Sequence, residues 1–160
     1  MAEPRELTVQ PIGRVVSGRR EADPDGLWET AVAEIEVDPA WAGALDGLEG
    51  FSHLWLLWWL DRFDDPPQAL RVRPEGRPEM PLTGIFATRS PHRPNPLALT
   101  AVRLVERQGA RLRVRGLDAY EGTPIIDIKP YLCRGDLIAE ATVPAWLEQL
   151  WQIHDREREA

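Results

Sequence analysis

The sequence predicts a mainly β protein, a single mixed or antiparallel β-barrel with a short helix after the second strand and a C-terminal helix. Two observations support this fold class. Many short segments alternate between apolar and polar residues, as strands do, and turn residues join them. No regular helices separate these segments, which argues against a parallel α/β sheet. A mostly antiparallel barrel accommodates such strands best.

The first third of the chain contains two predicted strands and a helix start. We expect a first strand over Thr8–Val16, interrupted by a proline, and then a polar loop over residues 17–26. Residues 28–37 alternate with strand periodicity. Asp38 is then followed by a proline, the order of an N-cap and a first helical residue, which predicts a short helix through about Leu45.

The most apolar stretch is Phe51–Leu60, which contains three tryptophans. Apart from Ser52 and His53 it is apolar on both faces, which predicts a strand buried on both sides, with a helix as the competing interpretation. In a small β protein an outer face this apolar requires a cover. Either a packed helix or a second subunit would provide it.

The rest of the chain alternates loops, strands and one helix. Five prolines and little periodicity predict a long loop over Asp61–Pro81, either a lid or a mobile segment. The elements expected after it are a strand, a hairpin around Gln108-Gly109, a turn, a short strand and a helix, at Leu82–Thr88, Leu97–Glu106 with Ala110–Leu117, Glu121–Pro124, Ile125–Ile128 and from Pro144 onwards. The helix carries an apolar stripe of Trp146, Leu147, Leu150 and Trp151, which we expect to face a core.

Composition narrows the class of protein. With 160 residues we expect one domain over residues 1–160 and no additional C-terminal domain. No apolar run approaches the length of a membrane span, and the N-terminus lacks the pattern of a secretion signal. One cysteine excludes an internal disulfide, and the scattered histidines offer no metal cluster. We therefore expect a cytoplasmic protein without a membrane segment or a metal.

Charge is distributed unevenly along the chain. The net charge is −7, which argues against indiscriminate coating of nucleic acid. Residues 86–115, however, carry seven arginines and only one glutamate. Such a window suits an anionic partner, for example a nucleic-acid backbone or a nucleotide cofactor. Four of these arginines alternate with apolar residues, so solvated strand faces are the alternative for Arg103, Arg111, Arg113 and Arg115.

The segment Thr88–Pro96, Thr-Arg-Ser-Pro-His-Arg-Pro-Asn-Pro, is the most informative one. Its prolines fix their own φ and push the preceding residues, Ser90, Arg93 and Asn95, toward extended conformations. The polar side chains of this loop are thereby arranged before a ligand arrives. A rigid structural turn with solvent-facing arginines is the alternative interpretation.

The chain contains a single lysine, Lys129, among its nineteen basic residues. Arginine serves elsewhere, so this position can require a compact ammonium, although chance retention explains a lone lysine equally well. Lys129 lies within Asp127-Ile-Lys-Pro-Tyr131. This segment, His53, the loop Arg89–Asn95 and the turn Asp118–Glu121 form a polar set that can converge at one rim of a barrel. The set suits a ligand with both positive and negative charge.

Several common catalytic motifs are absent. The sequence has no Gly-x-Gly, hence no dinucleotide fingerprint, and it also lacks a phosphate-binding loop ending in Gly-Lys-Ser/Thr. Ser90 precedes a proline and lacks the flanking glycines of a hydrolase elbow, so hydrolysis with His92 as the base is a weak hypothesis.

Three segments in order resemble a known family. They are Leu48-Glu-Gly-Phe-Ser-His-Leu-Trp55, Gly84-Ile-Phe-Ala-Thr-Arg-Ser-Pro-His-Arg-Pro-Asn-Pro96, and Leu117-Asp118 with Gly122-Thr-Pro124 and Asp127-Ile-Lys-Pro-Tyr131. Together they are similar to the TrmO (TsaA, YaeB-like) family. The resemblance implies a single β-barrel that uses S-adenosylmethionine, works as a homodimer with the cofactor near the interface, and methylates N6 of threonylcarbamoyl-adenosine beside the tRNA anticodon.

The resemblance also implies roles for individual residues. The cofactor site would comprise His53, Leu54, Arg89, Leu99, Asp118, Ala119, Tyr120 and Glu121. Arg89 would pair with the methionine carboxylate, and Tyr120 would face the adenine or the sulfonium. Asp127 or Tyr131 would act as the base, with Lys129 stabilising negative charge. Ser90, Arg93 and Asn95 would bind the substrate RNA.

The chain departs from the family pattern in three places. Ala98 replaces a glycine, which predicts a changed approach of cofactor or backbone. The Pro-Arg-Gln motif expected after the first strand is missing, and the C-terminal domain of longer members is not seen. Two alternatives therefore stay open: a methyltransferase of the same fold acting on another nucleoside or a small molecule, and a non-catalytic module that binds S-adenosylmethionine or RNA.

Overall fold

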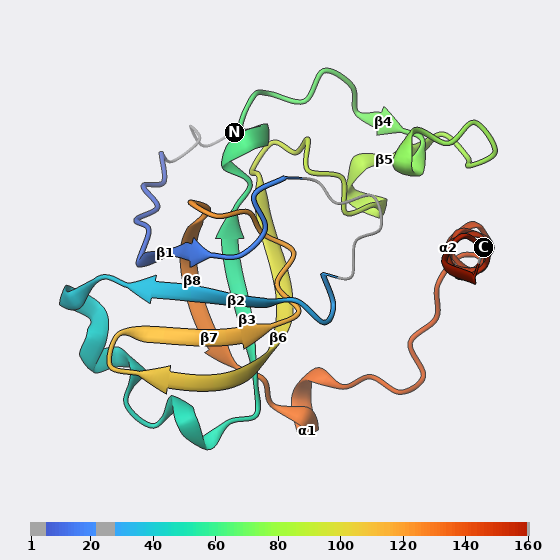
Figure 1. Ribbon diagram of the computed structural model, residues 1–160. Coiled ribbons are helices and arrows are strands. Elements are labelled where there is room, and N and C mark those ends of the chain that lie inside the picture. The colour runs from blue at the N-terminus through green and yellow to red at the C-terminus, as the bar shows by residue number, and fades with distance from the viewer. Residues whose placement is uncertain (1–5, 22–27, 160) are drawn as a thin grey trace. The chain divides into compact units, whose positions relative to one another are not determined.

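The computed structural model describes residues 6–21 and 28–159, which form two compact units (Figure 1). The barrel unit contains the described residues up to Asp61 together with Leu97–Tyr131. The second unit contains Arg62–Pro96 and the residues from Leu132 onwards.

The barrel unit is a closed barrel of six strands, as the alternating pattern predicted. Every pair of neighbouring strands is antiparallel, in the order β1-β2-β7-β6-β3-β8. The strands are β1 (Gly13–Ser17), β2 (Val32–Val37), β3 (His53–Trp59), β6 (Leu97–Gln108), β7 (Arg111–Arg115) and β8 (Pro124–Pro130). Closure removes the exposed edges that an open sheet would present.

The first two strands are shorter than predicted. β1 begins only at Gly13, because Pro11 cannot donate to a strand ladder. β2 begins at Val32, because the preceding residues form a turn in which the Ala31 N–H donates to the Trp28 carbonyl (3.2 Å). Part of the predicted polar loop, residues 22–27, lies outside the described residues.

The predicted helix after β2 is confirmed as the 3₁₀ helix η1 (Pro39–Leu45). The Asp38 side chain accepts a hydrogen bond from the Ala40 N–H (2.9 Å), so it caps the helix as its position predicted. A second short 3₁₀ helix, η2 (Leu48–Gly50), precedes β3.

The predicted strand at Phe51–Leu60 is confirmed as β3, but it is not buried on both sides. Leu54, Leu56 and Trp58 point into the barrel and are buried, because a closed barrel has only one interior. On the outer face the intervening residues are half-buried. The core that the inward residues complete consists of Val15, Ala33, Ile35, Val37, Leu45, Leu54, Leu56, Trp58, Val102, Leu112, Val114, Leu117, Ala119 and Ile125.

The predicted hairpin is confirmed as β6 and β7, with Gly109 at its tip in a left-handed conformation (φ 60°). β6 is long enough to pair with β3 through its first half and with β7 through its second half. The register shifts between Leu104 and Glu106, where the strand passes from one partner to the other. Arg103 belongs to both pairings.

The turn before β8 is also confirmed, with Gly122 at φ 92°. β8 extends beyond the predicted Ile125–Ile128 in both directions. Lys129 is therefore a strand residue, as Asp127 was expected to be.

The second unit has little regular structure, in agreement with the long loop predicted over Asp61–Pro81. Leu82–Thr88 was predicted to be a strand, but only Thr83 and Gly84 are, because the Ile85 carbonyl accepts from Thr88 N–H (3.1 Å) and closes a 3₁₀ turn. The other short elements at or within this unit are η3 (Asp61–Phe63), β4 (Arg71–Val72), η4 (Pro74–Gly76), β5 (Thr83–Gly84), η5 (Ile85–Ala87) and α1 (Cys133–Asp136).

The predicted C-terminal helix is α2 (Ala145–Glu159). Its stripe is partly as expected: Leu150 is buried and Trp146 and Leu147 are half-buried, but Trp151 is exposed. Neither this helix nor any other within residues 6–21 and 28–159 has the length and apolarity that crossing a membrane requires.

Candidate functional site

The residues predicted for the site fall in both units. The barrel unit holds most of them, namely His53, Leu54, Leu99, Asp118–Glu121, Asp127, Lys129 and Tyr131. The second unit holds the proline loop with Arg89, Ser90, Arg93 and Asn95.

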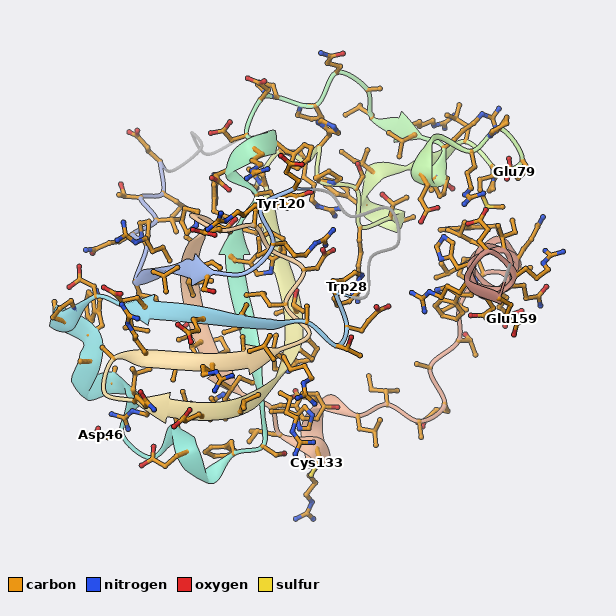
Figure 2. All side chains as sticks on the ribbon, in the orientation of Figure 1. Trp28, Asp46, Glu79, Tyr120, Cys133 and Glu159 are labelled. Carbon is orange, nitrogen blue, oxygen red and sulfur yellow. The ribbon has the colours of Figure 1, made fainter. Side chains whose placement is uncertain are left out.

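The acidic turn Asp118–Glu121 is tied to the loop that follows β1. Tyr120 forms an isolated parallel bridge with Arg19, and the Glu121 N–H donates to the Arg19 carbonyl (2.6 Å). The Gly122 N–H donates to the Val15 carbonyl (2.8 Å), which anchors the end of the turn on β1. The turn is therefore held by the barrel wall, at the end of the barrel where Tyr120 is labelled in Figure 2.

Two arginines of the same loop reach the carboxylates of this turn. Arg19 forms an ion pair with Asp118, and its guanidinium carbon lies 5.6 Å from the centroid of the Tyr120 ring. Arg20 Nε lies 2.9 Å from a carboxylate oxygen of Glu121. Arg19 Nε is buried and has no hydrogen-bond partner among the described residues. We call Arg19, Arg20, Asp118, Tyr120 and Glu121 the turn cluster.

The sequence interpretation missed Arg19 and Arg20, which it treated as part of a polar loop. The sequence shows two arginines directly after a strand and two acidic residues in a distant turn. No local pattern indicates that these two segments meet. Burial raises the pKa of the Asp118 carboxyl, against the opposing effect of Arg19 and with a smaller contribution from Glu29. A carboxylate in this position can accept hydrogen bonds from hydroxyl or amino groups of a ligand.

A second group of predicted residues lies on the outer face of β8, β3 and β6. Trp55 on β3 pairs with Lys129 on β8 and with Ala101 on β6, and Leu57 pairs in the same way with Asp127 and Leu99. Paired residues of antiparallel strands share a face. The structure therefore brings Asp127, Lys129 and Leu99 together on one surface, which we call the outer face.

Asp127 is fixed from two sides. One carboxylate oxygen lies 2.7 Å from Lys129 Nζ, and the other accepts from the Ile128 N–H (2.9 Å). Both side chains remain partly exposed to solvent. Lys129 is thus not an isolated charge, and its direct effect is to hold the carboxylate in place.

His53 and Tyr131 lie side by side at the other end of β3. The Tyr131 N–H donates to the His53 carbonyl (3.0 Å), and the two rings are 6.4 Å apart in an edge arrangement. The Tyr131 ring also packs on Trp55, with 5.5 Å between centroids. His53 is exposed and its Nδ1 lies 2.9 Å from Ser52 Oγ, so it is not a core histidine.

The geometry corrects three expectations. Leu54 and Ala119 are buried in the barrel core, so their side chains are not available to line a cofactor site. Ala98 packs against the same core from inside the barrel, so its extra methyl group does not obstruct the outer face.

The third correction concerns one part of the expected convergence at one rim, the relation of His53 to the end of the turn at Thr123. His53 begins β3, whereas Thr123, at the end of the acidic turn, has Oγ1 3.5 Å from Asp61 Oδ1, beyond the other end of β3. A strand of this length spans about 20 Å. His53 therefore does not share a rim with that end of the turn.

In the second unit, Arg93 braces the proline loop. Its guanidinium donates to the carbonyls of Thr88 (2.9 Å), Ser90 (3.2 Å) and Ile85 (3.3 Å). Its guanidinium carbon lies 5.8 Å from the Phe86 ring centroid. The loop is therefore rigid through an arginine as well as through its prolines. Arg89 and Asn95 are exposed, and neither forms a hydrogen bond or ion pair within the part of the chain that the structure describes.

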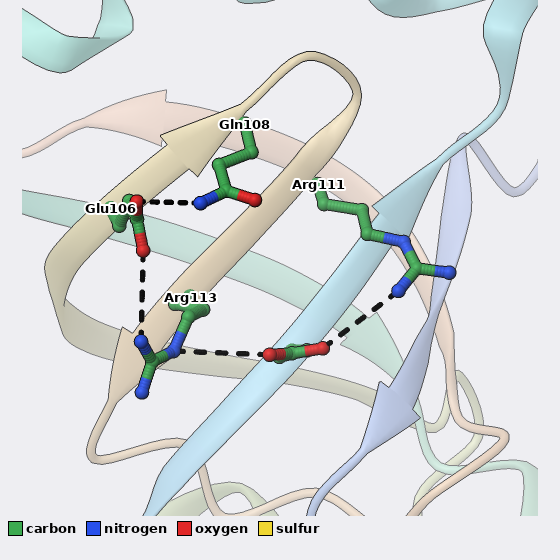
Figure 3. Close-up of a pocket in the computed structure, with 5 residues that line it drawn as sticks. Glu106, Gln108, Arg111 and Arg113 are labelled. Carbon is green, nitrogen blue, oxygen red and sulfur yellow. Dashed lines mark hydrogen bonds and ion pairs between the residues drawn. The ribbon is translucent and has the colours of Figure 1, made fainter.

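A hollow on β2, β6 and β7 gathers charged side chains but is self-neutralising (Figure 3). Arg111 lies 4.0 Å from Glu34, and Arg113 lies 3.8 Å from Glu34 and 3.6 Å from Glu106. Arg111 also lies 2.9 Å from Glu36. The guanidinium groups already have carboxylate partners, so this hollow is a cross-strand ion-pair network and not an anion site. Among the described residues no group of three metal-binding side chains is found.

Comparisons with known proteins place the chain in a family. The model of the tRNA-methyltransferase O N-terminal domain matches residues 22–137. A probable S-adenosyl-L-methionine-binding protein of Methanothermobacter thermautotrophicus is 44% identical over 129 residues, which are 79% of this chain and 90% of that protein. A human tRNA (adenine(37)-N6)-methyltransferase is 41% identical over 93 residues, 58% of this chain and 21% of that protein.

A solved structure agrees with these sequence matches. The crystal structure of TrmO from Pseudomonas aeruginosa has 30% sequence identity and a TM-score of 0.70, covering 96% of this chain and 76% of that one. Fold, motifs and sequence identity lead to the same assignment. This chain belongs to the family of the tRNA-methyltransferase O N-terminal domain.

Proposed function

We propose that this chain is an S-adenosylmethionine-dependent methyltransferase that acts on tRNA, at N6 of threonylcarbamoyl-adenosine beside the anticodon. The names of its relatives support the cofactor and the class of substrate. The observation that carries the proposal is the outer face, where the fixed carboxylate of Asp127 borders an apolar surface in a chain of this family.

The residues present fit the cofactor. The turn cluster offers a partly exposed Asp118 carboxylate for hydroxyl or amino groups and an aromatic ring for an adenine. Arg19 occupies one face of the Tyr120 ring, and its Nε is a buried donor without a partner among the described residues, as expected beside an absent acceptor. Arg89 stays our candidate for the methionine carboxylate, from the family resemblance.

When bound, S-adenosylmethionine supplies an electrophilic methyl group. The protein's own task is then to orient the acceptor nitrogen and to receive its proton. Asp127 is our candidate for the proton acceptor, because Lys129 and the Ile128 N–H hold its two oxygens in fixed directions while each keeps a free lone pair. Tyr131, which packs on His53 and Trp55, is the alternative base, and its ring is also suited to stacking on a base.

We propose a homodimer with the cofactor near its interface. The outer face carries Trp55, Leu57 and Trp59 on β3 and the exposed Leu97 and Leu99 on β6. Such an apolar surface is unusual for a monomer, and a second copy of the chain would cover Leu57, Trp59, Leu97 and Leu99, at the end of the outer face away from Tyr131. Light scattering tests this: a monomer at micromolar concentration contradicts it.

Binding of the cofactor is the first test. Calorimetry should detect binding of S-adenosylmethionine, and Asp118→Asn should weaken it roughly 10- to 100-fold, the effect of losing hydrogen bonds to a charged group. Asp46→Asn is the matched control, because Asp46 also pairs with an arginine on the barrel, Arg107 (3.0 Å), but outside the proposed site. The absence of binding at millimolar cofactor would remove the enzyme proposal.

The substrate needs a separate test. Mass spectrometry of tRNA nucleosides from a deletion strain should show loss of the N6-methyl group on threonylcarbamoyl-adenosine. An unchanged profile together with intact cofactor binding would favour a methyltransferase for another acceptor. Several relatives are named only as S-adenosylmethionine-binding proteins. Cofactor binding without methyl transfer to any RNA would therefore support the non-catalytic alternative.

A further inference from the structure

Two arginines face each other on the barrel, and neither has a counter-ion among the described residues. Arg103 on β6 pairs directly with Arg115 on β7, and both side chains are exposed. Neither forms an ion pair or a hydrogen bond within residues 6–21 and 28–159. Arg103 is also paired with His53 on β3, and Tyr131 lies beside His53. Arg115, Arg103, His53 and Tyr131 thus form a row across four strands, which we call the cationic row.

This placement is electrostatically unfavourable for the isolated protein. Like charges directly opposite each other on neighbouring strands destabilise a sheet. Elsewhere on the same two strands the arginines are compensated. Arg107 pairs with Asp46 and Glu49, at 3.0 Å in each case, and Arg111 and Arg113 belong to the ion-pair network of Figure 3.

The nearest acidic residue along the chain does not neutralise Arg115. Asp118 follows it by three residues, but its carboxylate is paired with Arg19 in the turn cluster. Within the described residues neither Arg103 nor Arg115 has a carboxylate partner, so their positive charge is available to a ligand. Two adjacent guanidinium groups are suited to phosphate oxygens, which they bind through pairs of parallel hydrogen bonds.

The aromatic end of the row indicates the kind of anion. His53 and Tyr131 continue directly from Arg103, and Trp55 packs on Tyr131. Guanidinium groups for phosphates next to rings for unstacked bases are the combination that proteins use for single-stranded RNA. We propose that the cationic row binds the phosphate backbone of the RNA substrate, with Arg103 and Arg115 as the phosphate contacts. This inference rests on the proposed function and assigns its RNA-binding surface on the barrel.

The row adjoins the proposed catalytic residues. Lys129 lies two residues before Tyr131 and on the same face. It pairs with Trp55, and Tyr131 lies beside His53, two residues before Trp55 on β3. Phosphates bound at Arg103 and Arg115 would thus hold an RNA loop next to Asp127 without contacting it. These arginines are positioning residues, and they are distinct from the loop residues of the second unit.

The experiment compares arginines of the neighbouring strands β6 and β7 that differ in whether they form ion pairs within the described residues. Arg103→Gln, Arg115→Gln and the double variant are compared with the control double variant Arg111→Gln, Arg113→Gln. Binding of unmodified tRNA is measured over a salt series, together with methyl transfer and calorimetric binding of S-adenosylmethionine. Circular dichroism confirms that each variant is folded.

Loss of a phosphate contact predicts a specific result. The slope of log affinity against log salt should fall by about 1 for each single variant and by about 2 for the double. Affinity near 50 mM salt should fall roughly tenfold per arginine. The KM for tRNA should rise while cofactor affinity and kcat stay unchanged, and the double Arg→Lys variant should keep most of the slope, because it keeps the charge.

The outcomes are separable. If the wild type methylates tRNA and the double glutamine variant keeps the full salt slope, the cationic row is not the phosphate site, although the proposed function stands. The same conclusion follows if the control variant lowers the slope as much. If the wild type binds cofactor but neither binds nor methylates tRNA, the proposed RNA substrate and this inference both fail.

Discussion

The barrel unit and the second unit are held together by different forces. Fourteen buried apolar side chains form one core inside the barrel. Among the described residues of the second unit, apart from prolines, only Met80, Ile85 and Leu150 are buried apolar side chains. Apolar burial scales with area removed from water, so it stabilises the barrel far more than the second unit.

In the second unit arginines replace a core. Arg93 binds three carbonyls, Arg73 binds those of Met80 and Pro78, and Arg77 pairs with Glu75 and Glu157 at 3.0 and 2.8 Å. The ion pairs of Arg77 respond to salt and, through their carboxylates, to acid pH, whereas a packed core carries no such titrating groups. The turn cluster and the outer face lie on the rigid unit, and the proline loop lies on the polar one. Substitutions in the two units should therefore fail in different ways.

The largest effect is expected in the barrel core. Leu112→Ala removes a fully buried side chain of β7 and should lower the free energy of unfolding by about 2–5 kcal/mol. Chemical denaturation followed by tryptophan fluorescence measures this. Leu99→Ala is the control, because Leu99 is 49% exposed and should cost less than about 1 kcal/mol. Equal losses at the two positions would contradict the assignment of inner and outer faces.

The barrel was predictable because its determinants are local and periodic. The alternation over residues 28–37, the hairpin with Gly109, and the cap at Asp38 each act within a few residues of chain. The apolar outer face of β3 was also visible in the sequence. A strand with only one buried face normally alternates with polar residues, whereas this segment is apolar on both faces. The prediction that both faces are buried was wrong because the sequence does not reveal which covers exist within the chain.

The grouping of the candidate site residues in space was predictable only where residues of one motif stay together. Asp127, Lys129 and Tyr131 share an outer face because they alternate along β8 and just beyond it. The contacts of Arg19 with Asp118 join residues 99 positions apart, and no local pattern encodes them. Leu54 and Ala119 were placed in the site by resemblance, although their alternation with outward residues already indicated the core. The assignment of Arg93 to RNA stays a prediction, beside its observed role as a brace.

A smaller and local effect is expected for Arg93. Arg93→Met keeps the aliphatic stem but removes the donors to the carbonyls of Ile85, Thr88 and Ser90. Local opening of the loop should become easier by about 1–3 kcal/mol. Hydrogen exchange of residues 85–95 measures this, while exchange in the barrel strands should not change. Arg89→Met is the control, since Arg89 is exposed and braces nothing among the described residues; equal loosening by both variants would refute the brace.

The smallest effect is expected from pH and concerns Glu75. This residue adopts the left-handed conformation (φ 55°), which side chains other than glycine seldom take, and its carboxylate contacts His154 and Arg77, at 3.0 Å in each case. Partial burial alone would raise the pKa of Glu75, but the hydrogen bonds from His154 and Arg77 outweigh it, so its pKa lies below the ordinary 4.5.

The sign of the pH effect follows from this lowered pKa. Above pH 4.5 the Glu75 contacts contribute their full stability, and this contribution is lost as the pH falls through the lowered pKa. Because the carboxylate is half exposed, the loss is expected to be below about 1 kcal/mol. Melting of α2 is followed by its helical circular dichroism between pH 3 and about 6. It should be less acid-sensitive in Glu75→Gln, because the contact of residue 75 with His154 then no longer depends on a titrating carboxylate. Glu148→Gln, an exposed position of the same helix, should keep the wild-type acid sensitivity. If Glu75→Gln melts with an unchanged pH dependence, the contacts of Glu75 do not stabilise α2. The conclusion that charged contacts stabilise the second unit, in contrast to the apolar core of the barrel, would then be contradicted at this helix.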